Sequence, residues 1–444
     1  MRLRPAYTLA LAVLIALMGT ASLWAQEKGF PEVLPVRERV ATVNRITLLR
    51  LDTLLPKVMR EAGFDMWIIP CEEDNVDPVF RTMVPMNTWF RRDLMLVFYD
   101  RGPDKGVERM DISRMGMRGF HTRVWDPGKE TRWECLTRIV KERNPKKIGI
   151  NQSDSIWAAD GLGATLKAKV EAALGETYVR RLHSAETMCT LWLETLLDEE
   201  LDVYERAVAV GHALIADAYS SRNVTPDVTT VDDVIYHYWQ QAADLGLEVG
   251  FDPSFSIRRS PELVEKYGKN DRVIRRGDLI HCDVGIIYLR YYTDHQEWAY
   301  VLRRGETDVP ESYKKVMAEG NRLQDIFARR FKAGLTGNEL LADILKTAKA
   351  EGIERPRIYS HGLGYYLHEP GPLIGLPEEQ VNTGGRGEVR LVPNSTFTAE
   401  LSVDVPVPEW GGSLLRMGLE QDIAFTTAGV QFLDGRQTAF FLIR

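Results

Sequence analysis

Apolar and polar positions follow two different periods along the first part of the chain. Between residues 36 and 62, apolar residues such as Leu51 and Leu55 recur at helical spacing, and Gly63 stands where a helix would end. Runs rich in apolar and β-branched residues predict strands at 66–69, 94–99 and 147–150, and helical patterns between and after them predict helices at 130–143 and 164–174. This alternation predicts an α/β domain, which we place at residues 26–187.

The second part of the chain, which we place at residues 188–444, opens on a long helical pattern from 191 to 220. Two more helices are predicted at 311–332 and 337–350, and strand-like runs lie around them. No low-complexity linker separates the two parts, so the boundary rests on the change of pattern near 185–190. The fold class expected for the whole chain is α/β, of the α+β kind in the second part.

A strict alternation marks the run from 278 to 287, where apolar residues take the even positions and Asp283 lies on the opposite face. If this run forms a hairpin with 290–300 about a turn at Tyr288-Leu289, Asp283 lies opposite Asp294. Directly opposed side chains have Cβ atoms about 4.5–5.5 Å apart. Two carboxylates at that spacing repel each other unless cations lie between them. The pair therefore predicts a divalent-metal site, although Tyr and Leu are unusual in a tight turn.

A second carboxylate pair follows the same logic. Glu400 and Glu420 lie in two strand-like runs with turn residues Gly411-Gly412 between them, so a hairpin could bring them together. His361 lies between the two pairs in the sequence, and glycines beside it permit a close backbone approach. An imidazole with several carboxylates suits Mn, Zn, Co or Fe. The set predicts a centre for two divalent metal ions, held by Asp283, Asp294, His361, Glu400 and Glu420.

Composition and charge narrow the classes of partner. The chain of 444 residues is 44% hydrophobic and 27% charged, which is typical of a globular protein. Its formal net charge of −7 argues against nucleic-acid or anionic-membrane partners. The four cysteines show no CxxC and no disulfide spacing, and Cys282 lies in an apolar strand pattern that predicts a buried thiol.

Residues 1–25 have the pattern of a secretory signal peptide. Arg2 and Arg4 precede an apolar run from Leu9 to Met18, and small residues follow up to Ala25. The apolar run is short for a transmembrane helix, and an uncleaved anchor is the alternative interpretation. We therefore expect a secreted or periplasmic protein, cleaved near Ala25, with no stable membrane insertion after the signal is removed.

The five-residue set resembles a known family. The segments that carry it, GDLIHCDVG, TD, SHGLGYYLHEP, FTAEL and GLEQD, are similar to those of the pita-bread metallopeptidases, which include methionine aminopeptidase, aminopeptidase P, prolidase and creatinase. The resemblance covers about residues 190–440. A separate N-terminal domain favours the aminopeptidase P, prolidase and creatinase branch. The resemblance implies a creatinase-like N-terminal α/β domain followed by a C-terminal pita-bread catalytic domain.

The resemblance also implies an activity, that of an exported dinuclear metal-dependent exopeptidase. The substrate would be a peptide, as for an Xaa-Pro aminopeptidase or dipeptidase, and a homodimer is the expected assembly. Two ions, Mn with Zn or Co as alternatives, would share a bridging water and lower its pKa. Glu400 would be both ligand and general base. His368, seven residues after His361, would contact the substrate and stabilise the tetrahedral intermediate; a loop histidine bound to backbone is the alternative.

Several positions depart from the pattern of the family. Relatives usually have a histidine near Lys266, another at the position of Arg357, an arginine at that of Gly418, and Thr-Arg where this chain has Gln296-Glu297. The predicted metal ligands are thus complete while the residues around the substrate are altered. The sequence therefore supports hydrolysis more strongly than it supports selectivity for proline.

His281 is a further candidate. It shares a strand face with Asp283, at a position that is usually apolar in relatives. One hypothesis is that His281 replaces a lost active-site imidazole, and a partly buried, hydrogen-bonded histidine is the alternative. His295 points away from the face that carries Asp294.

Two other functions compete with the exopeptidase. One is a non-peptidase enzyme on the same scaffold that cleaves another carbon–nitrogen bond, as creatinase does, but creatinase lacks the metal-ligand set. The other is a non-catalytic member of the fold that binds metal or peptide without turnover, and the altered positions around the substrate favour it.

Overall fold

The structure is a computed structural model and describes residues 30–117 and 119–444. The predicted signal peptide at 1–25 lies outside the described residues. Residues 34–444 form one compact unit, so the domain boundary near 187 stays a prediction. Within the described ranges, no helix is long and apolar enough to cross a membrane.

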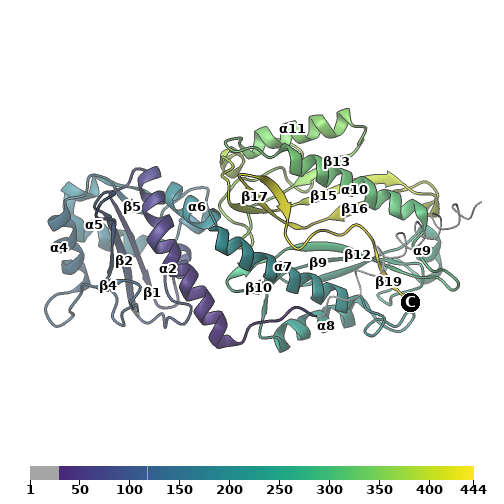
Figure 1. The fold of residues 1–444 in the computed structure, drawn as a ribbon, viewed down its shortest axis with the longest axis horizontal. Helices are drawn as coiled ribbons and strands as arrows, with labels where there is room; N and C mark the ends of the chain where they lie inside the picture. Colours follow the sequence, from purple (N-terminus) through teal and green to yellow (C-terminus); the bar gives the residue numbers. More distant parts are fainter. Residues whose placement is uncertain (1–29, 118) are drawn as a thin grey trace, which may run out of the picture. The chain divides into compact units, whose positions relative to one another are not determined.

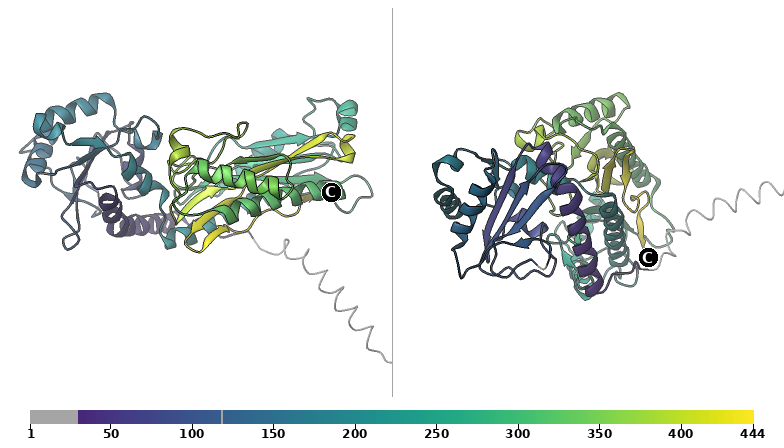
Figure 2. Two further views of the ribbon diagram at one scale, coloured as in Figure 1. Left: turned by 90° about the horizontal axis from the view of Figure 1, so that it is seen from above. Right: turned by 60° about the vertical axis from the view of Figure 1, so that its left-hand side comes forward.

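The first module is a six-stranded mixed sheet with helices on both faces (Figure 1). Its elements are α2 Val36–Glu61, β1 Met66–Glu72, α3 Pro78–Thr82, β2 Asp93–Asp100, β3 Val107–Asp111, β4 Thr122–Arg123, α4 Arg132–Arg143, β5 Ile148–Ile150, η1 Trp157–Ala159, α5 Ala164–Val179 and β6 Leu182–Ser184. The strand order is β4-β3-β2-β1-β5-β6. Helices α4 and α5 pack on one face, and α2 lies on the other (Figure 2). The strands and helices predicted here, and the α/β class, are confirmed.

The strand β1 lies in the middle of this sheet. It pairs antiparallel with β2 and parallel with β5. Nearly every residue of β1 is buried, including Trp67 and Ile68, because helices cover both faces of the sheet. That is why its sequence is a continuous apolar run with no alternation.

The prediction of one continuous helix from 191 to 220 is wrong in one respect. The structure has two helices there, α6 Glu186–Glu194 and α7 Asp198–Ala218, joined by an extended connection. The backbone N–H of Leu196 in this connection donates to the carbonyl of Asn394 at 2.7 Å. The apolar pattern continues through the break, so its periodicity did not reveal the tertiary contact that ends the helix.

The second module packs two sheets between pairs of helices (Figure 1). Its remaining elements are α8 Val231–Asp244, β7 Glu248–Val249, β8 Ser254–Arg258, α9 Pro261–Tyr267, β9 Leu279–Val284, β10 Ile286–Tyr288, β11 Tyr291–Tyr292, β12 His295–Val301, α10 Glu311–Arg330, α11 Gly337–Ala350, β13 Pro356–Tyr359, η2 Gly385–Glu388, β14 Ser395–Thr398, β15 Glu400–Pro406, η3 Pro408–Trp410, β16 Leu414–Leu419, β17 Asp422–Thr426, β18 Gly429–Phe432 and β19 Phe441–Ile443. The strand orders are β19-β12-β9-β8 and β13-β15-β16, with two smaller sheets, β14-β17-β18 and β11-β10-β7. Helices α7 and α8 contact β8, β10 and β12, whereas α10 and α11 contact β13, β15 and β16.

The hairpin that carries the first aspartate has a different register from the predicted one. Strands β9 and β12 pair antiparallel with Asp283 opposite Gln296. The turn consists of Leu289 and Arg290, whose φ angles are 53° and 76°, as a two-residue hairpin turn requires. The turn predicted at Tyr288-Leu289 is therefore wrong by one residue, and the two aspartates are not directly opposed.

All four cysteines are free and buried in the structure. Cys282 lies in β9 and is fully buried, as predicted from the apolar alternation. Burial also raises the pKa of its thiol far above the ordinary value. The thiol is therefore a packing residue with little thiolate character at neutral pH.

Candidate metal centre and adjoining cavity

The five side chains predicted as metal ligands come together between the two sheets of the second module. Asp283 lies in β9, Asp294 directly before β12, and His361 shortly after β13, while Glu400 begins β15 and Glu420 follows β16. Nε2 of His361 is 3.8 Å from Oδ2 of Asp294. Asp294, His361 and Glu420 each offer one ligand atom, and these atoms lie within 4.8 Å of one another. These three residues are buried.

The two glutamates adjoin each other because the register of β15 and β16, continued by one residue, places Glu400 opposite Glu420. This is the proximity that the sequence predicted. The amide Nε2 of Gln296 donates to Oε1 of Glu400 at 2.9 Å and to Oε2 of Glu420 at 2.7 Å. Gln296 lies opposite Asp283 across β9 and β12, so Asp283 also lies near the two glutamates.

Burial and mutual repulsion oppose ionisation of these carboxylates. Burial raises the pKa of Asp283 to about 6. Burial, together with the charge of Asp283, raises the pKa of Glu400 to about 7. For Asp294 and Glu420, burial followed by the neighbouring carboxylates raises the pKa well above the ordinary range. Divalent cations at this place would remove the conflict.

Two further observations fit a metal. Oδ1 of Asp294 and Oε1 of Glu420 are buried and have no hydrogen-bond partner within 30–117 and 119–444. Nδ1 of His361 donates to the carbonyl of Gly362 at 3.1 Å, which leaves Nε2 as the free acceptor. Burial lowers the pKa of His361 to about 3, so its imidazole is neutral, the form that binds a metal. Four carboxylates and one neutral imidazole make a suitable donor set for divalent cations.

His368 lies beside the predicted ligand His361, with ring centroids 4.5 Å apart. The side chain is exposed, and its ring nitrogens have no hydrogen-bond partner in the described part of the chain. It is therefore not a loop histidine held by backbone bonds, and its imidazole is free to meet a substrate. The ring is shielded from solvent on the side of His361, and this partial burial, followed by the charge of Arg386, lowers the pKa of His368. Sequence reasoning missed Arg386, because no local pattern places η2 next to His368.

The structure also shows the surroundings of three residues that depart from the family pattern. Lys266 is exposed on α9. Arg357 forms an ion pair with Glu378 at 3.0 Å. A Cβ atom at Gly418 would lie 3.1 Å from Oε1 of Gln296, so the glutamine occupies the space beside the glycine.

His281 contacts the glutamates only through Gln296. Its Nε2 donates to Oε1 of Gln296 at 3.1 Å, and its ring packs on Trp298 with centroids 4.6 Å apart. Burial lowers the pKa of His281 to about 3, so the ring is neutral. The side chain is partly buried and hydrogen-bonded, and a catalytic role for it stays a prediction.

A second polar cluster, which sequence reasoning missed, lies on the opposite face of β12. Asp422 accepts a hydrogen bond from the backbone N–H of Asp294 at 3.2 Å. His295 lies near Asp422, 3.7 Å from its carboxylate, and packs on His212 with ring centroids 4.6 Å apart. His295 thus points away from the ligand face, as predicted. The cluster holds the backbone of Asp294, one of the predicted ligands, in place.

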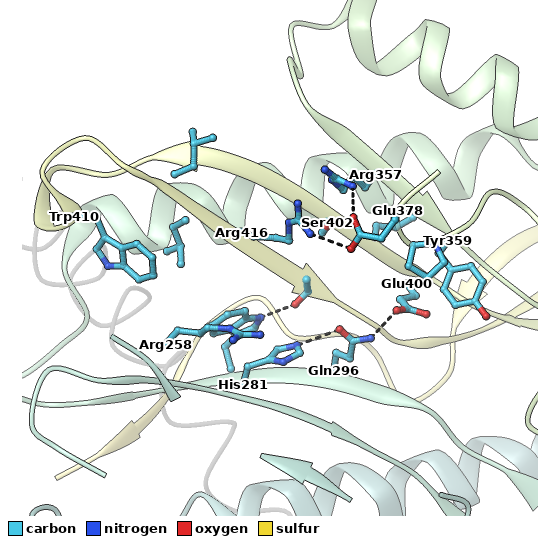
Figure 3. Close-up of a pocket in the computed structure, with 16 residues that line it drawn as sticks. Arg258, His281, Gln296, Arg357, Tyr359, Glu378, Glu400, Ser402, Trp410 and Arg416 are labelled. Carbon is cyan, nitrogen blue, oxygen red and sulfur yellow. Dashed lines mark hydrogen bonds and ion pairs between the residues drawn. The ribbon is translucent and has the colours of Figure 1, made fainter. Parts of the chain in front are cut away.

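A cavity of about 390 Å³ opens beside Glu400 (Figure 3). Trp298, Tyr359 and Trp410 give it apolar walls, and it is also lined by the arginines Arg258, Arg357 and Arg416. The strands that supply these residues are far apart in the sequence. For that reason no local pattern predicted the cavity.

Comparisons with known proteins agree with this geometry. Residues 202–429, just over half of the chain, match the model of metallopeptidase family M24. An X-Pro aminopeptidase from Thermotoga maritima is structurally similar, with a TM-score of 0.62 at 18% identity, over 87% of this chain and 100% of that one. An Xaa-Pro dipeptidase from Bacillus anthracis has a TM-score of 0.58 at 17% identity, over 89% of this chain and 100% of that one.

A dipeptidase from Mycobacterium ulcerans has a TM-score of 0.57 at 16% identity, over 90% of this chain and 98% of that one. No curated protein matches the sequence. The solved structures share the fold with this chain, while the family match covers the strands that carry all five predicted ligands. The chain therefore belongs to metallopeptidase family M24 and is a hydrolase with the pita-bread fold of the aminopeptidase P and prolidase branch.

Proposed function

We propose that the protein is a dinuclear metal-dependent exopeptidase that releases N-terminal residues from short peptides, most like an Xaa-Pro aminopeptidase or dipeptidase. The observation that carries this proposal is the cluster of Asp294, His361 and Glu420, whose ligand atoms lie within 4.8 Å of one another. One buried oxygen each of Asp294 and Glu420 lacks a hydrogen-bond partner among the described residues. The five predicted ligands would hold both ions, Mn with Zn or Co as alternatives.

The chemistry divides between the ions and the side chains. The ions would supply a nucleophilic hydroxide at neutral pH and polarise the scissile carbonyl. Glu400, at the wall of the cavity, receives the proton of the attacking water and passes it to the leaving amine. His368 donates a hydrogen bond to the oxyanion of the tetrahedral intermediate, which its exposed ring beside His361 allows.

The deciding experiment is elemental analysis of the purified protein followed by hydrolysis tests. Xaa-Pro and Xaa-Ala dipeptides and longer peptides would be offered to protein loaded with Mn, Co or Zn. We expect release of the N-terminal residue, and we expect Asp283→Ala to lose both metal and activity. Absence of hydrolysis across the whole peptide set, with metal bound, would overturn the proposal.

A binding protein without turnover is the second candidate, and Gln296 favours it. Its amide donates to Glu400, the proposed general base, and this hydrogen bond opposes the rise in the pKa of Glu400, so the carboxylate takes up a proton less readily. The binding protein would take up metal or peptide in calorimetry yet release no product. The exopeptidase would bind metal and peptide and also release product. The same peptide assay therefore separates the two functions.

Export and assembly belong to the same proposal. Arg2, Arg4 and the apolar run from Leu9 to Met18 support secretion or a periplasmic location, with cleavage near Ala25. N-terminal sequencing of protein recovered from the exported fraction tests this, and an intact Met1 would contradict it. A homodimer is also proposed, and sedimentation equilibrium measures it directly.

A further inference from the structure

Arg258 reaches the cavity beside Glu400 from the end of β8. In the antiparallel pairing of β8 with β9, Ser254 lies opposite Asp283 and Ser256 opposite His281. Arg258 is two residues further along, so its side chain leaves the strand on the same face as Asp283. Figure 3 shows Arg258 beside His281 in the lining of the cavity.

The charge of Arg258 has no partner in the part of the chain that the structure describes, in contrast to its neighbours. The next residue, Arg259, points the other way and forms a bidentate pair with Asp278 at 2.9 Å. No ion pair or side-chain hydrogen bond joins Arg258 to any residue within 30–117 and 119–444. Its guanidinium therefore presents unused donors.

The other arginines of the cavity are already neutralised. Arg357 pairs with Glu378 at 3.0 Å, and Arg416 pairs with Asp404 at 3.0 Å. Longer contacts of 3.5 Å and 3.7 Å join these four side chains into one network with no net charge. This leaves Arg258 and Glu400 as the unbalanced charges of the wall, and the proposed metal ions balance Glu400.

The cationic head also lies close to the inner part of the cavity. Figure 3 shows Arg258 beside His281, which donates to Gln296, and the amide of Gln296 donates in turn to Glu400. Trp298 and Trp410 give the same cavity apolar walls. The cavity thus combines room for an apolar peptide side chain with one unpaired cation in its lining.

We propose that Arg258 is a specificity-determining residue that binds a carboxylate of the peptide substrate. The inference rests on the proposed exopeptidase function and names the substrate class of that site. A guanidinium offers two parallel N–H donors that match the two oxygens of a carboxylate. The carboxylate has two sources: the free C-terminus of a very short peptide, or the side chain of an aspartate or glutamate.

The test compares acid and neutral forms of otherwise identical peptides. The pairs are Ala-Ala against Ala-Ala-amide for the C-terminus, Glu-Ala-amide against Gln-Ala-amide for an N-terminal acidic side chain, and Ala-Glu-amide against Ala-Gln-amide for the next position. For one pair, the metal-loaded wild type should show kcat/KM about tenfold higher for the acid, mainly through KM. Arg258→Met should bring that ratio close to one, and Arg258→Lys should keep part of it.

A matched control comes from the same wall of the cavity. The double variant Arg416→Met with Asp404→Asn removes one cation together with the anion that balances it, so the network keeps no net charge and the acid-to-neutral ratio should stay as in the wild type. Metal content is measured for every variant, because loss of metal would lower all rates without changing the ratio. The pair that responds to Arg258→Met identifies the source of the carboxylate.

Binding separates this inference from the proposed function. Calorimetry with reduced-bond analogues of the same pairs, which carry no scissile carbonyl, measures acid preference without turnover. If no peptide is hydrolysed but the acid analogue binds about tenfold more tightly through Arg258, the exopeptidase proposal fails and carboxylate recognition stands. If peptides are hydrolysed and no pair shows a preference that Arg258→Met removes, the inference about Arg258 is overturned.

Discussion

Gln296 lies directly opposite Asp283 across β9 and β12, and its amide donates hydrogen bonds to both Glu400 and Glu420. One neutral side chain of β12 thus bonds both glutamates supplied by the sheet that contains β15 and β16. His281 donates to the carbonyl oxygen of the same amide, which fixes the direction in which the NH₂ group points. The orientation of two predicted metal ligands therefore depends on a residue that is not a ligand.

Removing the amide should weaken metal binding. Gln296→Ala leaves Glu400 and Glu420 without the donor that orients them, and loss of such outer hydrogen bonds commonly costs about tenfold or more in metal affinity. Competition with a chelator measures the affinity. Gln240→Ala removes an exposed glutamine whose side chain donates to Asp244, on a helix away from the glutamates; it is the control and should leave the metal affinity unchanged. An unchanged affinity in Gln296→Ala would contradict the prediction.

The hypothesis that His281 replaces a lost imidazole has a direct test. Because the structure connects His281 to the glutamates through Gln296, His281→Ala should lower turnover while metal content falls only slightly. The neutral ring, whose pKa is lowered to about 3, should add no step to the activity profile near pH 6.5. Unchanged turnover together with unchanged metal content would eliminate the hypothesis.

Stabilisation by metal should grow with pH. In the metal-free protein, burial raises the pKa of Asp283 to about 6 and that of Glu400 to about 7, above unfolded values near 4. The folded state then holds more protons, so the contribution of these groups to stability is lost as pH rises from about 4 to about 7. Metal binds the deprotonated ligands and reverses this loss. Calorimetry should show a larger rise in Tm on adding Mn²⁺ at pH 8 than at pH 5, and equal rises would contradict the assignment.

A buried ion pair joins α2 to α7 and should be sensitive to loss of one partner. Nη1 of Arg50 donates to Glu200 at 2.7 Å, and both side chains are fully buried. Arg50→Met leaves the carboxylate of Glu200 unpaired and should cost about 3–5 kcal/mol in the free energy of unfolding. Arg45→Met removes an exposed pair with Glu199 and should cost less than about 1 kcal/mol. Denaturant unfolding measures both, and equal effects would refute the distinction.

Much of the local structure could be predicted because it depends on neighbouring residues. Helix α11 spans Gly337–Ala350, as the apolar periodicity predicted, and Thr336 and Glu339 form the capping box that begins it. The alternation around Asp283 correctly placed its side chain opposite the apolar face of β9. In both cases the repeat of the backbone itself decides which way each side chain points.

The order of the five predicted ligands was equally a property of the sequence, and the structure brings them to one place. The sequence did not reveal which residues lie directly opposite each other across β9 and β12. That depends on the turn at Leu289 and Arg290, whose positive φ angles are uncommon for such residues. Leu289 is buried, and Arg290 donates to the carbonyl of Val84, far away in the chain.

The sequence by itself thus determined the element types, the faces of the strands and the identity of the predicted ligands, because these follow from local periodicity and side-chain chemistry. Only the tertiary structure decided the break at Leu196, the place of Gln296 between the glutamates, and the unpaired position of Arg258. Each of these depends on contacts between segments far apart along the chain. These contacts stabilise the protein only once the distant segments pack against each other. No local sequence pattern therefore predicts them.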